Sequence, residues 1–127
     1  MKIKSVNSMA CPTPLGGYSQ AIMVQGVSKL LFISGQIPES KDGTVPNDFE
    51  SQCRLVWSNV IAQLEAAEMA IANITKVTIF LSKRKYADIN GVIRKEILGE
   101  HKPALTVIIT GIFDEKWLLE IEAVAAA

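Results

Sequence analysis

One long apolar stripe constrains this chain more than any other feature of its sequence. Between positions 49 and 67, apolar side chains recur at steps of three and four residues: Phe49, Cys53, Val56, Trp57, Val60, Leu64 and Ala67. This spacing places them on one face of an α-helix of about five turns. Asn47 offers an N-cap oxygen, and Glu50 lies at the spacing of a capping box. The stripe therefore predicts an amphipathic helix packed against another layer.

Six further segments have the apolar runs or the alternation that is typical of β-strands. They cover residues 1–8, 21–25, 29–35, 74–81, 106–112 and 118–125. Gly26-Val27-Ser28 separates the second segment from the third, and this spacing predicts a β-hairpin. A second, shorter helix is indicated by Tyr86, Ile89, Ile93 and Ile97. The order of elements predicts one α+β domain that spans residues 1–127.

Two of the predicted strands are too apolar for a sheet that is covered on one face only. Leu30 to Ile33 and Val107 to Ile109 do not alternate, which is typical of strands buried on both faces. Two helices can cover only one face of a sheet of about six strands. We therefore expect a second subunit to cover the other face.

Charge and composition exclude several classes of function. The chain has 13 basic and 13 acidic residues, so no net charge attracts nucleic acid or an anionic membrane, and no segment is long enough to span a bilayer. The N-terminus lacks the apolar core of a signal peptide, so we expect a cytoplasmic protein. Cys11, Cys53 and His101 are too few for a zinc site or a disulfide framework. No phosphate-loop motif is present, and we expect neither a metal nor another cofactor.

Several motifs, in one order, resemble those of the Rid (YjgF) family of imine and enamine deaminases. They are Pro14 to Ile22 (PLGGYSQAI), Phe32 to Pro38 (FISGQIP), Gln52, Asn59, Leu64 to Ala67 (LEAA), Asn90, Pro103-Ala104 and Leu119 to Ala123 (LEIEA). The resemblance implies a chorismate-mutase-like fold, with two helices on one face of a six-stranded mixed sheet. It also implies a homotrimer that binds a small molecule in a cleft between subunits. Family members hydrolyse imines and enamines to 2-oxo acids and ammonia without a cofactor.

The resemblance also implies which residues form the site. Glu120 would be the catalytic residue that orients water, although a solvated or interface carboxylate is the alternative. The substrate-binding residues would be Tyr18, Ser34, Gly35, Asn90, Leu105 and Val107. Tyr18 could instead be a packing tyrosine, and Ser34 could instead cap a strand or serve in a turn.

Leu105 is the main departure from the family pattern. It stands where the family has an arginine that binds the substrate carboxylate, and Val107 stands where a cysteine is common. Losing one partner of a buried charge pair costs about 2–5 kcal/mol, so small 2-imino acids should bind poorly. Arg94 and Lys102 are possible replacement cations. Three hypotheses remain: an imine or enamine hydrolase with altered substrate recognition, a non-catalytic binding or sensing protein, and a structural trimer.

Overall fold

The computed structural model describes all 127 residues as two helices and six strands, so the predicted α+β class is confirmed. The helices are α1 (Phe49–Ala66) and α2 (Ala87–Leu98). The strands are β1 (Lys2–Val6), β2 (Ala21–Gln25), β3 (Leu30–Gln36), β4 (Ile74–Leu81), β5 (Ala104–Ile109) and β6 (Leu119–Ala126). The 3₁₀ turns η1 (Ile71–Asn73) and η2 (Arg84–Tyr86) precede β4 and α2 respectively.

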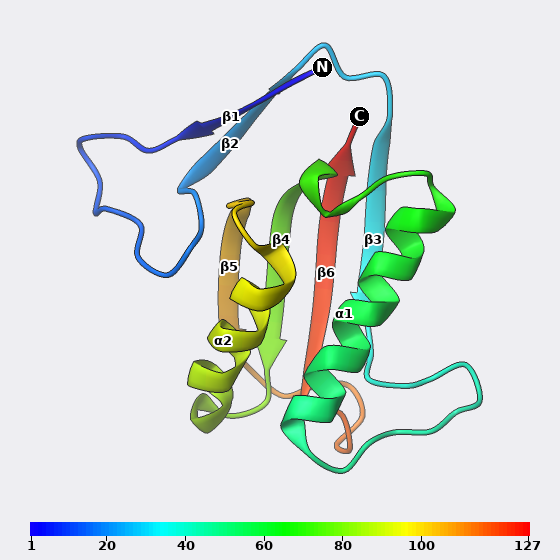
Figure 1. Ribbon diagram of the computed structural model, residues 1–127. Helices are drawn as coiled ribbons and strands as arrows, with labels where there is room; N and C mark the ends of the chain where they lie inside the picture. The colour runs from blue at the N-terminus through cyan, green and yellow to red at the C-terminus, as the bar shows by residue number, and fades with distance from the viewer.

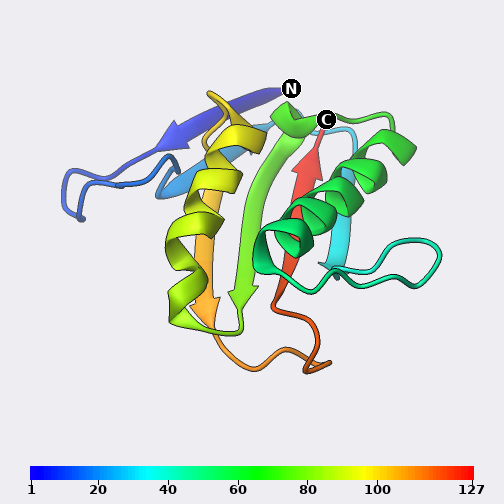
Figure 2. The same cartoon turned by 60° about the horizontal axis from the view of Figure 1, so that its bottom comes forward.

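The strands form two sheets. The larger sheet has the order β3-β6-β4-β5, in which only β4 and β5 run parallel, and β1 pairs with β2 in a separate two-stranded sheet. Figures 1 and 2 show α1 and α2 side by side on the same face of the four-stranded sheet. The two predicted helices therefore cover one face, and the other face carries no layer.

The hydrophobic core lies between the helices and the covered face of the sheet. The apolar stripe of α1 is buried as predicted, and Trp57 at its centre is fully buried. Alternate residues of the two central strands meet this stripe, because successive side chains of a strand point to opposite faces. The core residues of these strands are Ile74, Val77, Ile79, Leu81, Leu119, Ile121, Ala123 and Ala125.

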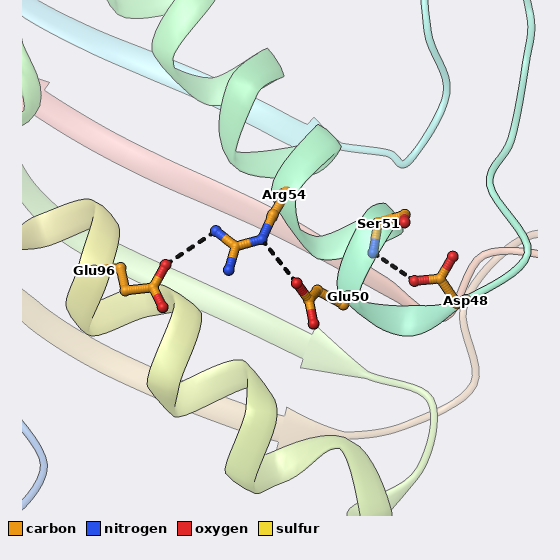
Figure 3. A network of polar contacts seen from close by, with 5 residues as sticks. All are labelled: Asp48, Glu50, Ser51, Arg54 and Glu96. Carbon is orange, nitrogen blue, oxygen red and sulfur yellow. Dashed lines mark hydrogen bonds and ion pairs between the residues drawn. The ribbon is translucent and has the colours of Figure 1, made fainter.

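The start of α1 differs by one residue from the prediction. Asp48, not Asn47, is the N-cap: its Oδ2 accepts a hydrogen bond of 2.9 Å from the backbone N–H of Ser51 (Figure 3). This bond lowers the pKa of the Asp48 carboxyl. Asp and Asn are equally good N-caps, so the capping preference alone does not choose between neighbouring candidates.

The predicted hairpin between residues 21–25 and 29–35 is wrong. β2 pairs with β1, and β3 pairs with β6 alone, so the expected six-stranded sheet is divided into sheets of four and two strands. Contacts before β2 explain the difference. The Ser19 N–H donates to Pro103 O at 3.0 Å, and Ser19 forms an isolated bridge with Ala104 at the start of β5. The chain thus enters β2 beside the β5 edge of the sheet.

Burial on both faces is also not found in the single chain. Leu30 and Phe32 are 55% and 73% exposed, and Val107 and Ile108 are each 40% exposed. The open face has no covering layer, and α2 covers β5 only in part. β5 also ends at Ile109 rather than at residue 112. Coverage by a second subunit remains a prediction.

Candidate functional site

Glu120 lies on the open face of the sheet, as its alternation with Ile121 predicts. In the register of β4 and β6, Glu120 is opposite Phe80, while the fully buried Ile121 is opposite Ile79. The Glu120 side chain borders a hollow of about 280 Å³, which we call the Glu120 hollow. Its lining residues are Phe80, Thr110, Gly111, Ile112, Phe113 and Glu120. A carboxylate beside apolar groups in a surface hollow is a common setting for proton transfer.

A β-bulge in β3 adjoins the Glu120 carboxyl. Ile33 pairs with Ala123 and Gln36 with Ile121, so Ser34 and Gly35 together lie opposite the single residue between those partners. A side chain at Gly35 would collide with the Glu120 carboxyl group. Ser34 is exposed in the same bulge. Gly35 therefore allows the carboxyl to lie against the backbone of β3, so Gly35 and Glu120 come together. Ser34 instead borders a neighbouring hollow that Glu122 also lines.

The environment of Glu120 favours its neutral form. Partial burial raises the pKa of the carboxyl, and the negative charge of Glu122 on the same face raises it further. A carboxyl with a raised pKa is a better proton acceptor once ionised and a more available donor when neutral. The arrangement is suited to moving a proton between water and a bound molecule.

Two amide side chains on α1 hold the loops around this site. Gln52 is buried, and its Nε2 donates to Pro46 O at 2.8 Å and to Lys116 O at 2.9 Å, while its Oε1 accepts from the Leu118 N–H at 2.7 Å. Asn59 Nδ2 donates to Ile37 O at 2.9 Å. Gln52 thereby fixes the backbone just before Glu120. The sequence motifs flagged both residues, but no sequence signal indicated this positioning role.

Leu105 and Val107 face away from Glu120. In the parallel register of β4 and β5, Leu105 lies beside Val77 and Val107 beside Ile79, which are both core residues. Leu105 packs against the hydrophobic core and has no polar atom to offer a ligand. Glu120 lies on the opposite face of the same sheet, with β4 between its strand and β5. One chain therefore does not bring the predicted Leu105 and Glu120 positions together.

Tyr18, Asn90 and Arg94 form a second group, between α2 and the N-terminal loop. Asn90 and Arg94, one helical turn apart, are 1% and 6% exposed. Arg94 Nη2 donates to Gly16 O at 2.6 Å, whereas Arg94 Nε and Asn90 Oδ1 have no hydrogen-bond partner. Burial lowers the pKa of Arg94, partly offset by Tyr18. These unused polar atoms are buried, so Asn90 is not accessible to a ligand in the single chain.

The other candidate residues have backbone or structural roles. Lys102 is exposed, and its carbonyl oxygen accepts a hydrogen bond of 2.6 Å from Ser19 Oγ. Cys53 is fully buried, and burial raises the pKa of its thiol to about 12. No group of three His, Cys, Asp or Glu side chains is arranged to hold a metal ion. No helix has the combined length and apolar character needed to cross a membrane.

The chain is similar in sequence to one protein family and to several known proteins. The family model described as Endoribonuclease L-PSP matches residues 8–127. A RutC family protein of Pyrococcus horikoshii is 40% identical over 117 residues, which cover 90% of each chain. TdcF of Escherichia coli, whose name describes it provisionally as a reactive intermediate deaminase, is 32% identical over 127 residues, covering 96% of this chain and 95% of TdcF.

The chain is also similar to several solved structures. The crystal structure of E. coli TdcF with bound serine covers 98% of both chains with a TM-score of 0.73 and 29% identity. The Rid family protein YyfB of Yersinia pestis, described as being of unknown function, covers 100% of both chains with a TM-score of 0.85, and at 21% identity it supports the fold alone. The match to the family model over nearly the whole chain shows that the protein belongs to the Endoribonuclease L-PSP family, which includes the RutC and Rid proteins.

Proposed function

We propose that this chain is a cofactor-independent deaminase that hydrolyses a reactive imine or enamine in a cleft between the subunits of a cytoplasmic homotrimer. The observation that carries the proposal is the Glu120 carboxyl, which lies beside Gly35 in a partly apolar hollow and has a raised pKa. The provisional name of TdcF and the serine in its crystal structure support a small amino-acid-derived ligand.

The proposed reaction uses Glu120 to move two protons, one after the other. The ionised carboxylate accepts a proton from water as the water oxygen bonds to the imine carbon, and the electron pair of the C=N π bond moves to nitrogen. The protonated Glu120 then returns the proton to nitrogen. Glu120 next accepts the hydroxyl proton of this carbinolamine and delivers it to the same nitrogen, so the C–N bond breaks as the carbonyl forms, and ammonia leaves. One imine and one water thus give one carbonyl compound and one ammonia.

Leu105 argues for a substrate that does not need a cation at that position. A leucine offers no donor to a carboxylate, and burying that carboxylate beside it carries a desolvation penalty. We therefore propose a larger or more apolar imine than 2-iminopropanoate. Tyr18, Ser34, Gly35 and Val107 remain the proposed contacts with the substrate, whereas the buried Asn90 would support Tyr18 without touching the substrate. Tyr18 would come from one subunit, and Ser34, Gly35 and Glu120 from its neighbour.

Competition for imines generated in situ tests this proposal. An amino-acid oxidase would release imines from alanine, leucine and phenylalanine, and semicarbazide would trap whatever the protein has not hydrolysed. We expect faster loss of the leucine- and phenylalanine-derived imines than of 2-iminopropanoate, and no acceleration by Glu120→Gln. Glu122→Gln, on the same strand and face, is the matched control and should stay active. Equal rates for Glu120→Gln and the unsubstituted protein would contradict the assigned role.

The alternative is a non-catalytic binding or sensing protein on the same fold, and Leu105 favours it because the position contributes no polar group. This alternative predicts that apolar carboxylic acids raise the melting temperature while no imine is hydrolysed. Leu105→Arg distinguishes the two further. Gain of 2-iminopropanoate hydrolysis would indicate that catalysis needs only the family cation, whereas folded but inactive Leu105→Arg would favour the binding protein or the structural trimer.

A further inference from the structure

The outer edge of β3 has no partner in the chain. β3 pairs with β6 on one side only, and no strand lies on its other side. Leu30 and Phe32 on this strand are more than half exposed, and no proline interrupts Leu30–Gln36. An exposed apolar edge of this length is a template for another strand, and proteins normally protect or pair such edges.

β2 has the complementary free edge. It pairs with β1 through the five residue pairs from Lys2–Gln25 to Val6–Ala21, and its other side carries no strand of the four-stranded sheet. Only four residues separate β2 from β3, a connection short enough for a hairpin, yet the two strands do not pair with each other. The sequences of β2 and β3 thus predict that these strands pair with each other, but within one chain they lie apart.

Hydrogen bonds before and after β2 keep it apart from β3. Before β2, Ser19 bonds to the backbone of residues 102 and 103 at the β5 edge, and Arg94 Nη2 holds Gly16 O. After β2, the N–H groups of Ser28 and Lys29 donate to Ala127 O at 2.8 and 2.9 Å, which fixes the start of β3 beside the end of β6. Figure 1 shows the β1–β2 hairpin on the β5 side of the sheet and β3 at the opposite edge.

We propose that the hairpin is exchanged between copies of this chain: anchored on its own β5 edge, β2 adds antiparallel to the free β3 edge of a second copy. The occupant is a second copy because β2 is the segment whose spacing predicts pairing with β3. The contact joins two different surfaces head to tail, and contacts of this kind close into rings when the rotation permits. Each junction would bring the Tyr18 group of one copy toward the β3 and β6 strands of the next.

Engineered disulfides test whether this pairing lies within or between chains. A hairpin with the connection Gly26–Ser28 would place Met23 opposite Leu31 and Ile22 opposite Phe32, and exchange preserves these pairs. Adjacent antiparallel pairs alternate between hydrogen-bonded and non-hydrogen-bonded positions, so one of the two is suited to a disulfide. We would make Met23→Cys/Leu31→Cys and Ile22→Cys/Phe32→Cys in a Cys11→Ser background. The buried Cys53 can remain, because its thiol is inaccessible.

Oxidation followed by non-reducing electrophoresis and intact mass gives the result. We expect at least one double variant to form covalent species larger than a monomer, up to the full ring. Lys4→Cys/Met23→Cys is the matched control, because Lys4 and Met23 are opposite each other in β1 and β2 and should link within one chain. Linkage of the β2–β3 pair within one chain would overturn the exchange. No β2–β3 linkage in either variant, while the control links, would overturn it as well.

Discussion

The two faces of the four-stranded sheet use the same strands and differ in almost every other respect. On the helix-covered face, Val77, Ile79 and Ile121 are completely buried. On the open face, their neighbours include Phe32, Glu120 and Glu122, and two hollows of about 240 and 280 Å³ remain. The helices of the chain cover one face. The other face carries apolar and ionisable groups that have no partner within the chain. Stability therefore depends on the first face, and the proposed chemistry and assembly on the second.

The largest effect should come from truncating the covered face. Ile121→Ala removes a fully buried side chain and leaves a cavity, so we expect a loss of about 2–5 kcal/mol in the free energy of unfolding. Phe32→Ala, on the open face, should change the stability of the single chain by less than about 0.5 kcal/mol. Urea denaturation at low protein concentration measures both. Equal losses would show that the open face is already packed under those conditions.

The next largest effect should come from Gln52, whose buried side chain joins α1 to the loop before β6. Gln52→Leu leaves two carbonyl groups and one N–H without their partner, and water can reach them only in part. We expect a loss of about 1–3 kcal/mol in the free energy of unfolding. Imine hydrolysis should fall more than stability alone explains, because the backbone before Glu120 is released. Unchanged activity in the folded variant would contradict the positioning role of Gln52.

The open face, unlike the covered one, should make stability depend on pH, because it carries Glu120. Its pKa is raised in the folded chain, so the ionised form destabilises the fold at neutral pH, and this effect disappears as pH falls below the unfolded-state pKa. Glu120→Gln should therefore raise the melting temperature at pH 7 and leave it unchanged near pH 3.5. Thermal denaturation over this range provides the measurement. A fall in melting temperature at pH 7 would mean that the carboxylate is stabilised by a partner, such as a cation from another subunit.

The smallest effect should come from the exposed ion pairs of Arg54, one within α1 and one between α1 and α2. Arg54 contacts Glu50 at 3.3 Å and Glu96 at 3.0 Å, and all three side chains are about half exposed (Figure 3). Exposed pairs contribute about 0.2–1 kcal/mol, so Arg54→Gln should cost no more than that, and less in high salt. Arg94→Gln, which disturbs a buried arginine, is the contrasting variant. A larger loss in Arg54→Gln would mean that the pair also orients α1 against α2.

The sequence predicted those parts of the fold that depend on local periodicity. α1, β4 and the alternation of β6 follow from side-chain spacing within one segment, and all three were correct. The partner of β2 was not predictable in this way, because contacts between Ser19 and residues 102–104, far away in the sequence, decide it. A hairpin signal describes only the two strands and the turn.

The site was predictable to a similar degree. Alternation with Ile121 placed Glu120 away from the core, and the motif linked it with Gly35. The orientation of Leu105 depends on its pairing with Val77, and the length of a strand does not reveal its register with a parallel neighbour. The burial of Arg94 is similar: helical spacing puts it on the same face as Asn90, but the identity of the segment covering that face is a tertiary property.

The pairing of β3 with β6 also imposes an order on synthesis. β3 ends at Gln36, whereas its only partner begins at Leu119, so most of the chain must leave the ribosome before β3 can be paired. β1 and β2 are available to each other from the beginning. Because domains begin to form during translation, the N-terminal hairpin has time to fold alone, while β3 waits with both edges free. Two chains translated from one messenger RNA would therefore meet while β3 is still unpaired in both.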